Sequence, residues 1–358
     1  MKVQTTVVIP NYNGIKYIEG CLDSLLGGTM VPEIIVVDNA STDGSRELIE
    51  EKYPQVLLLK LSANTGFCHA VNAGIHLTRT RYVILLNNDI RADERFVEEL
   101  HAAISQDGRA FSAQAKMLSM NEPDTIDDAG DLYCAFGWAF ARGKGAPAAK
   151  YNHKGRIFSS CAGAAIYRMS VFEEIGLFDE RHFCYLEDVD ICYRAKIFGY
   201  RNLYAPKAIV YHAGSAATGS RHNPFKEEMT AGNNYYLLYK NMPALQYGLN
   251  LPLIKAGIAI KRSYFDKKGL KEPYEKGLLR GELLCARAME QEELEREELP
   301  YKKDSIPKEA GLSSYDEAQE KVKPLYLAQK VPFMWGNLPN YVKIQLELWG
   351  NCFLWLKK

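Results

Sequence analysis

Carboxylates stand at two places in this sequence where their setting suits them for chemistry. The apolar run VILLNNDI, residues 83–90, stops on two amides and the carboxylate of Asp89. Further along, the segment FDERHFCYLEDVDICYR, residues 178–194, places the adjacent acids Glu187 and Asp188 among apolar and aromatic side chains. A carboxylate can ligate a divalent cation that binds a phosphate, and a carboxylate beside a hydroxyl can act as a general base. The apolar flanks of the second segment argue against a merely solvated acidic helix start.

The elements that would position Asp89 alternate along the first 105 residues. Apolar, β-branched runs predict strands, and apolar residues at helical spacing predict the helices between them. Polar side chains follow three of these strands, namely Asn11, Asp38 and the stretch that ends at Asp89. Such alternation is typical of an open parallel sheet with helices on both faces, which binds ligands at the carboxyl ends of its strands. We therefore expect the three polar ends to lie together on one rim. The expected strands cover residues 4–10, 33–37, 56–61 and 82–86, and the expected helices cover residues 17–26, 45–52, 65–77 and 92–105.

The rest of the chain is less regular before it becomes helical. Residues 106–160 show little periodicity, and two short strand-like segments follow at residues 202–204 and 208–211, directly before His212. Beyond about residue 225, helical patterns dominate. The sequence thus predicts an α/β region followed by a helical C-terminal region.

Composition argues against several classes of protein. Lys plus Arg and Asp plus Glu each number 44 among 358 residues, so the formal net charge is zero, whereas duplex-binding domains usually carry a basic excess. The eight cysteines show no CxxC spacing, which favours reduced thiols over disulfides or a zinc site. The first strand ends in PNYNG rather than GxGxxG, and no P-loop motif GxxxxGK(S/T) occurs. With neither a signal region nor a run of ~20 uncharged residues, we expect a cytoplasmic protein with no nucleic-acid partner.

Six segments occur in an order that points to a known family. They are VVIPNYNG, VVDNASTDGS, NTGFCHAVNAG, LLNND, FCYLEDVDICYR and YHAG, and they span roughly residues 3–240. Each motif alone is weak, but the ordered set resembles the family 2 glycosyltransferases of the GT-A fold, most closely their rhamnosyltransferase-like branch. The resemblance implies an open, mostly parallel α/β sheet with helices on both faces. It also implies a catalytic domain over residues 1–240, with a nucleotide-binding half (about 1–105) and an acceptor half (about 106–240), and a helical C-terminal extension over residues 241–358.

Through this resemblance we expect an inverting glycosyltransferase that moves a sugar from a nucleotide diphosphate to an acceptor hydroxyl. The acceptor would be a saccharide or a lipid-linked saccharide of bacterial surface polysaccharide synthesis, and thymidine-diphosphate rhamnose is the favoured donor. A lipid-linked acceptor would place the protein peripherally at the inner face of the cell membrane. Two alternatives stay open: a sugar-1-phosphate nucleotidyltransferase, which normally has a Gly-rich loop with Arg and Lys where PNYNG stands here, and a non-catalytic carbohydrate-binding relative.

The resemblance also assigns a metal site. A leaving nucleotide diphosphate develops negative charge, which Mg²⁺ or Mn²⁺ can neutralise as a Lewis acid. Asp89 is the expected first ligand and His212 the second, with a plain strand-end histidine as the alternative at that position. The family commonly carries two acids spaced D-x-D, whereas this chain has Asn87, Asn88 and Asp89 and keeps only the last acid. A neutral amide is a weaker ligand, so the missing acid bears on metal affinity.

The remaining site residues divide between donor and acceptor. Asp38 is expected to hydrogen-bond the pyrimidine base, with an Asx turn or a helix cap as its structural alternative. Asp188 is expected to take the proton from the acceptor hydroxyl on the sugar face opposite the leaving group, and Glu187 to orient donor or acceptor. Asp190 and Arg194, four residues apart, are expected to pair on one helix. The residues expected to line the nucleotide pocket with Asp38 are Pro10, Asn11, Tyr12, Asn64, Gly66 and Asn88.

The C-terminal region contains apolar stretches whose partner the sequence leaves open. Residues 341–356 (YVKIQLELWGNCFLWL) have many large apolar side chains and few charges, and residues 258–262 (IAIKR) mix apolar and basic side chains. Such segments can lie on a membrane surface, or they can pack on the catalytic domain or on a second subunit.

Overall fold

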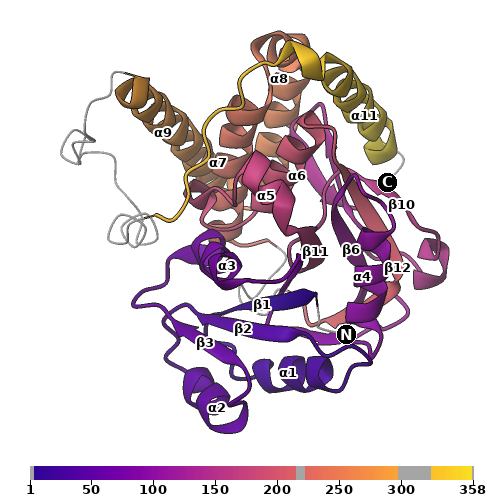
Figure 1. The fold of residues 1–358 in the computed structure, drawn as a ribbon. Coiled ribbons are helices and arrows are strands. Elements are labelled where there is room, and N and C mark those ends of the chain that lie inside the picture. The colour runs from indigo at the N-terminus through magenta and orange to yellow at the C-terminus, as the bar shows by residue number, and fades with distance from the viewer. Residues whose placement is uncertain (1–3, 215–221, 297–323, 357–358) are drawn as a thin grey trace.

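The chain folds around one large sheet with helices on both of its faces (Figure 1). The computed structural model describes residues 4–214, 222–296 and 324–356. In this part of the chain, no helix combines the length and the hydrophobicity that crossing a membrane requires. The strands are β1 (Thr5–Asn11), β2 (Glu33–Asp38), β3 (Leu57–Lys60), β4 (Tyr82–Leu86), β5 (Ile90–Ala92), β6 (Ala110–Ser119), β7 (Ile126–Asp128), β8 (Asp131–Cys134), β9 (Trp138–Ala141), β10 (Gly155–Ile157), β11 (Ala164–Arg168) and β12 (Arg201–His212). The α-helices are α1 (Ile18–Leu26), α2 (Ser45–Lys52), α3 (Gly66–Leu77), α4 (Phe96–Ser105), α5 (Met169–Ile175), α6 (Glu187–Ile197), α7 (Pro224–Asn241), α8 (Ala244–Lys267), α9 (Lys271–Arg296) and α11 (Leu338–Leu356).

The first half of the sheet follows the predicted alternation. β1 pairs in parallel with β2 on one side and with β4 on the other, and β3 extends the sheet beyond β2. β1, β2 and β4 carry continuous apolar runs because the central strands of an open α/β sheet are covered on both faces. Their ends lie within one residue of the predicted ends. The fourth helix begins at Phe96 rather than at residue 92, because residues 90–92 form β5 and pair with β12.

The second half of the sheet contains a strand that the sequence did not predict. Within residues 106–160, β6 is ten residues long and almost entirely buried. Its buried side chains include Ser112, Gln114 and Lys116, whose polar groups are hydrogen-bonded inside the fold. These polar residues interrupt the apolar pattern by which a buried strand is recognised.

Two further strands, β11 and β12, flank β6, while the short strands β7 and β10 pair with β6 and β12. β11 runs antiparallel between β4 and β6 and joins the two halves. β12 runs parallel to β6, and it unites the segments that were predicted separately at residues 202–204 and 208–211. The register with β6 shifts between Ala205 and Ile209, an irregularity that explains why the apolar pattern is interrupted there.

Two apolar cores cover the two faces of the sheet. One core lies under α1, α2 and α4, and the other lies under α3, α5 and α6. Leu22 and Phe96 are fully buried in the first core, and Val71 and Ile191 in the second. The predicted class, an open and mostly parallel α/β sheet with a C-terminal helical region, is confirmed.

The C-terminal helices gather on the side of the second half of the sheet (Figure 1). α7 and α9 approach closely because glycines line their contact, and a Cβ at Gly232 would lie only 2.8 Å from the carbonyl oxygen of Gly277. α11 buries Ile344 and Leu348 in a core that it shares with α6 and with the hairpin of β8 and β9. One face of the apolar C-terminal stretch therefore packs on α6 and on the β8–β9 hairpin of the α/β region.

Candidate active site

The three polar strand ends meet on one rim of the sheet, as predicted. Asn11, at the end of β1, is fully buried and donates its amide to Asp38 Oδ1 at 3.1 Å and to Ser45 Oγ at 2.9 Å. Asn88, beyond β4, donates its amide to Asn11 Oδ1 at 2.8 Å. These side chains form a hydrogen-bonded row where open α/β sheets bind their ligands.

Asp38 is enclosed by protein donors. Arg46 donates from Nε at 2.9 Å and from Nη2 at 2.6 Å to Asp38 Oδ2, and the backbone N–H of Ser41 donates to the same oxygen at 3.1 Å. Burial opposes ionisation, but the hydrogen bonds from Ser41, Arg46 and Asn11 outweigh it and hold the pKa of Asp38 below its usual value. Sequence reasoning missed Arg46, in the first turn of α2, although it is the one basic residue between residues 38 and 46. The predicted contact of Asp38 with a base stays a prediction, and Arg46 would have to move for it.

The other residues that were predicted to line the nucleotide pocket lie near this row. The side chain of Tyr12 is 46% exposed, and Pro10 is half-buried. Asn64 Oδ1 accepts hydrogen bonds from Asn39 Nδ2 at 3.0 Å and from the Gly66 N–H at 3.1 Å. The Asn64 side chain thus organises the start of α3.

Gly66 brings the start of α3 against the acidic segment of the sequence. Its φ is +86°, and a Cβ there would lie 2.5 Å from the ring of Phe183. The N–H of Cys68 also donates to the carbonyl oxygen of Phe183 at 3.1 Å. The contact that requires a glycine is therefore with Phe183, and close approach to a diphosphate stays a prediction.

The two predicted metal ligands are adjacent. His212 Nε2 lies 3.3 Å from Asp89 Oδ1, because β5 pairs with the end of β12 and the Ala213 N–H donates to the Asp89 carbonyl oxygen at 3.1 Å. His212 Nδ1 lies 2.8 Å from Asp127 Oδ2. A carboxylate on the far ring nitrogen is the usual support of a metal-binding histidine, so this pair fits a divalent ion. Burial lowers the pKa of His212, but Asp127 and Asp89 outweigh burial and raise it to about 9. Asp127 was not predicted, because no motif or spacing connects it with His212, which lies 85 residues away.

The acidic pair begins α6 after a strained turn. Phe183, Tyr185 and Leu186 have φ values of 58°, 71° and 65°, in the left-handed region that bulky residues rarely adopt. Asn233 of α7 holds this turn, since its Nδ2 lies 2.8 Å from the carbonyl oxygen of Tyr185 and also from those of residues 182 and 184. Arg280 Nη1 of α9 donates to Asn233 Oδ1 at 2.7 Å. Strain of this kind is typical of functional sites and persists only where the surroundings enforce it.

Glu187 and Asp188 occupy different environments. Glu187 is buried and its Oε2 has no hydrogen-bond partner among the described residues, whereas Asp188 is half-buried. Burial raises the pKa of Asp188 to about 6 despite backbone hydrogen bonds, one of them from Ala162. Burial and the charge of Asp188 raise the pKa of Glu187 as well. Gly163 follows Ala162, and its carbonyl oxygen accepts a hydrogen bond from the Asn87 N–H at 2.9 Å. The backbone segment that contacts Asp188 therefore also contacts the rim of strand ends, at the residue after β4.

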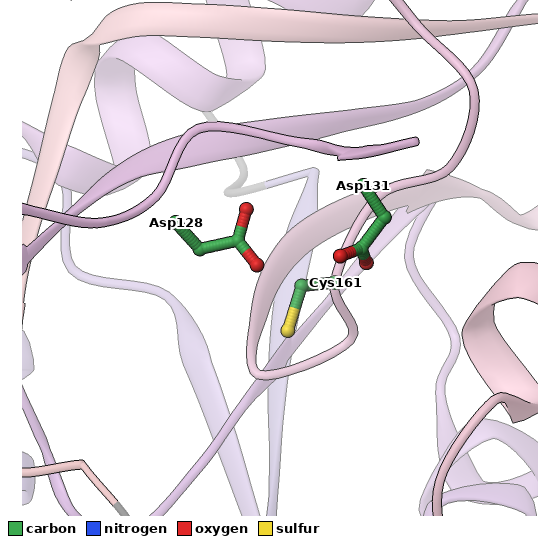
Figure 2. A group of neighbouring side chains, drawn as sticks. All are labelled: Asp128, Asp131 and Cys161. Carbon is green, nitrogen blue, oxygen red and sulfur yellow. The ribbon is translucent and has the colours of Figure 1, made fainter. Parts of the chain in front are cut away.

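A second carboxylate group, missed by sequence reasoning, lies near Asp188. The ligand atoms of Asp128, Asp131 and Cys161 all lie within 4.8 Å of one another, and Figure 2 shows the two carboxylates facing each other above the Cys161 side chain. Gln114 Nε2 donates to Asp128 Oδ1 at 3.0 Å. Burial, with Asp127 nearby, raises the pKa of Asp128 to about 6, and burial together with Asp128 and Asp188 raises that of Asp131. These three residues could hold a metal ion, although a thiol suits soft metals better than Mg²⁺ or Mn²⁺.

Comparison with known proteins identifies the class of the chain. Residues 6–176 match the family model Glycosyl transferase family 2. Over 239 residues, the chain is 28% identical to the N-acetylglucosaminyl-diphospho-decaprenol L-rhamnosyltransferase of Mycobacterium tuberculosis, which covers 60% of this chain and 77% of that protein. Over 144 residues, it is 31% identical to the putative teichuronic acid biosynthesis glycosyltransferase TuaG of Bacillus subtilis, covering 36% of this chain and 57% of that protein.

Among solved structures, a mannosyltransferase from Pyrobaculum calidifontis in complex with GDP-Man and Mn²⁺ has a TM-score of 0.48 at 16% identity, covering 81% of this chain and 87% of that chain. The match to the family model makes residues 6–176 a domain of glycosyltransferase family 2, as the motifs predicted. The resemblance to a rhamnosyltransferase likewise agrees with the Mycobacterium tuberculosis relative.

Proposed function

We propose that this protein transfers a sugar, with inversion, from a nucleotide diphosphate to a hydroxyl of a saccharide or a lipid-linked saccharide at the inner face of the cell membrane. One observation carries the proposal: Asp188, a carboxylate with its pKa raised to about 6, stands at the start of α6, and the backbone beside it contacts the rim of strand ends. Rhamnose is the favoured sugar because the Mycobacterium tuberculosis relative is named as a rhamnosyltransferase.

The rim of strand ends binds the donor, and the start of α6 acts on the acceptor. The nucleotide occupies the rim formed by Asn11, Asp38 and Asn88, with the exposed ring of Tyr12 available to the base. Asp188 takes the proton of the acceptor hydroxyl while that oxygen bonds to the anomeric carbon and the bond to the diphosphate breaks. Glu187, buried beside it, orients the acceptor or the donor.

Asp89 and His212 hold Mg²⁺ or Mn²⁺ in this proposal. The ion supplies neutralising charge to the departing diphosphate. The support for this site over the group of Asp128, Asp131 and Cys161 is chemical. Carboxylate and imidazole ligands suit either ion, whereas a thiol suits softer metals, and burial together with the nearby acids raises the pKa of the Cys161 thiol.

The proposal is tested by nucleotide release. The protein is first screened with a panel of nucleotide sugars and Mn²⁺ by thermal shift, since a bound donor stabilises the folded state. The stabilising donor is then incubated with and without saccharide acceptors, and the released nucleoside diphosphate and the anomeric configuration of the product are measured. We expect release that depends on Asp188 and a product of inverted configuration. A protein that binds a nucleotide sugar yet releases no nucleoside diphosphate with any acceptor is a binding protein and not this enzyme.

A further inference from the structure

Large apolar side chains are exposed mainly in the helical C-terminal region. Among the described residues, five exposed large hydrophobic residues lie before residue 78, and fifteen lie between residues 245 and 354. Soluble proteins rarely expose apolar side chains in such concentration unless they bind something there.

The first element of this exposed surface is the outer side of α11. Tyr341, Ile344 and Leu348 are buried on the inner side. The outer side carries five apolar side chains spaced three or four residues apart, so they lie on one stripe. They are Leu338 (43% exposed), Val342 (52%), Leu346 (61%), Trp349 (37%) and Phe353 (67%).

The second element is α8, which lies against α11. Asn250 Nδ2 of α8 donates to Gln345 Oε1 at 2.8 Å, and Trp349 Nε1 donates to Asn250 Oδ1 at 3.1 Å. Next to Asn250, Leu249 is 55% exposed, and the side chains of Leu245 and Ile260 on α8 are exposed as well. Trp349 of the α11 stripe therefore reaches α8 at Asn250. On α8, Leu245, Leu249 and Ile260 recur at helical spacing and lie along one side of that helix. We call the five residues of the α11 stripe, together with Leu245, Leu249 and Ile260, the α8–α11 face.

The charge around this face is positive. α8 and α11 carry five basic residues and two acidic ones. Both acids are ion-paired, Asp266 with Lys271 at 3.4 Å and Glu347 with Lys196 at 2.9 Å. One of the basic residues, Arg262, is ion-paired with Glu275 at 3.2 Å, so the positive charge of this face comes from its lysines. Lys255 and Lys343 are exposed.

We propose that the α8–α11 face lies on the surface of an anionic lipid bilayer. Leu, Trp and Phe side chains enter the boundary between headgroups and acyl chains, while flanking lysines extend their ammonium groups to anionic headgroups. A second copy of the chain is a poorer partner, because a two-fold contact through this face would bring its positive charges together.

The position of the face agrees with a lipid-linked acceptor, and in this respect the inference rests on the proposed function. α11 packs on the hairpin of β8 and β9, where Asn351 Nδ2 donates to the Tyr133 carbonyl oxygen at 2.8 Å. That hairpin begins at Asp131, whose carboxylate belongs to the group near Asp188. The face is therefore attached to the acceptor side of the site.

The test is flotation of the full chain with vesicles of phosphatidylglycerol and, separately, of phosphatidylcholine. We expect binding to phosphatidylglycerol vesicles that weakens with salt. The double variant Leu346→Glu, Phe353→Glu should lower the bound fraction by at least about tenfold, because two inserted side chains become charged. The matched control is Leu57→Glu, at a residue that is 52% exposed on β3, and it should bind like the wild type.

Three results would overturn the inference. They are no flotation with phosphatidylglycerol, an equal loss in Leu57→Glu, and a dimer that the double variant converts to monomer while vesicle binding stays absent. Turnover with a saccharide acceptor free of lipid separates this inference from the proposed function, because the double variant should retain it. Vesicle binding without transfer to any acceptor would remove the proposed function and leave the bilayer contact standing.

Discussion

The amino group of Lys240 lies 2.8 Å from a carboxylate oxygen of Asp190 and 2.8 Å from one of Asp179, and none of the three side chains is exposed. Arg194 also pairs with Asp190, at 3.0 Å, which confirms the predicted pairing on α6. Burial opposes ionisation of both acids, but Lys240 and the neighbouring cations outweigh burial and hold their pKa values below the usual range. This network fixes α6, and with it Asp188, to α7.

Replacing Lys240 with methionine should therefore destabilise the fold. The change leaves Asp179 and Asp190 buried with too little positive charge, and removing one partner of a buried ion pair typically costs about 3–5 kcal/mol. Urea unfolding gives the free energy, with Lys267→Met, at an exposed residue of α8, as the control. Equal stability of the two variants would show that the network does not hold the fold.

Asp188→Asn should lower turnover by about 10²–10⁴-fold, the usual share of general-base catalysis, or roughly 3–5 kcal/mol at ~1.4 kcal/mol per decade. Donor binding should persist, because the nucleotide is assigned to the rim. Glu187→Gln should change acceptor affinity more than turnover. Steady-state kinetics with a donor-binding isotherm measures both effects. If Glu187→Gln is inactive while Asp188→Asn turns over at nearly the wild-type rate, Glu187 is the general base and Asp188 is the positioning residue.

Activity should have an acid limb near pH 6. The base must be ionised, and burial raises the pKa of Asp188 to about 6, so the rate falls as pH decreases through that value. The charge of Asp128 contributes to this raised pKa, so Asp128→Asn should move the limb to lower pH. Asp124→Asn, at an exposed residue nearby, is the control. If the acid limb of the pH–activity profile has the same midpoint in Asp128→Asn as in the wild type, a group other than Asp188 controls this limb.

Metal affinity should rise with pH. His212 is mostly protonated below its raised pKa of about 9, and an ion must displace that proton, so affinity for Mn²⁺ increases by up to about tenfold per pH unit below this value. Calorimetric titration of Mn²⁺ in the presence of nucleoside diphosphate measures the slope. His212→Ala should abolish the slope, Asp89→Ala should abolish binding, and Asp131→Asn should change neither. If only Asp131→Asn loses Mn²⁺ binding, the ion is bound by the group of Asp128, Asp131 and Cys161 shown in Figure 2.

The predictions from sequence succeeded where one local rule determined the structure. The runs in β1, β2 and β4 are continuous because both faces are covered, and parallel strands place Asn11, Asp38 and Asn88 on one rim. β6 was missed because hydrogen bonds across the fold, such as that from Gln114 to Asp128, allow polar side chains in a buried strand. The partners of distant residues were missed for a similar reason, since no spacing connects residue 127 with residue 212.

The place of β11 has a consequence for how the chain assembles. Every residue of β4 is buried. One edge of β4 pairs with β1, and among the described residues the other edge pairs with β11, residues 164–168. A fragment that ends near residue 105 would expose an apolar strand edge, which invites pairing with other chains. During synthesis, the edge of β4 in the half assigned to the donor therefore stays unpaired until residue 168 has left the ribosome. We expect the two halves of the sheet to fold as one unit, and attempts to express the first alone to yield aggregates.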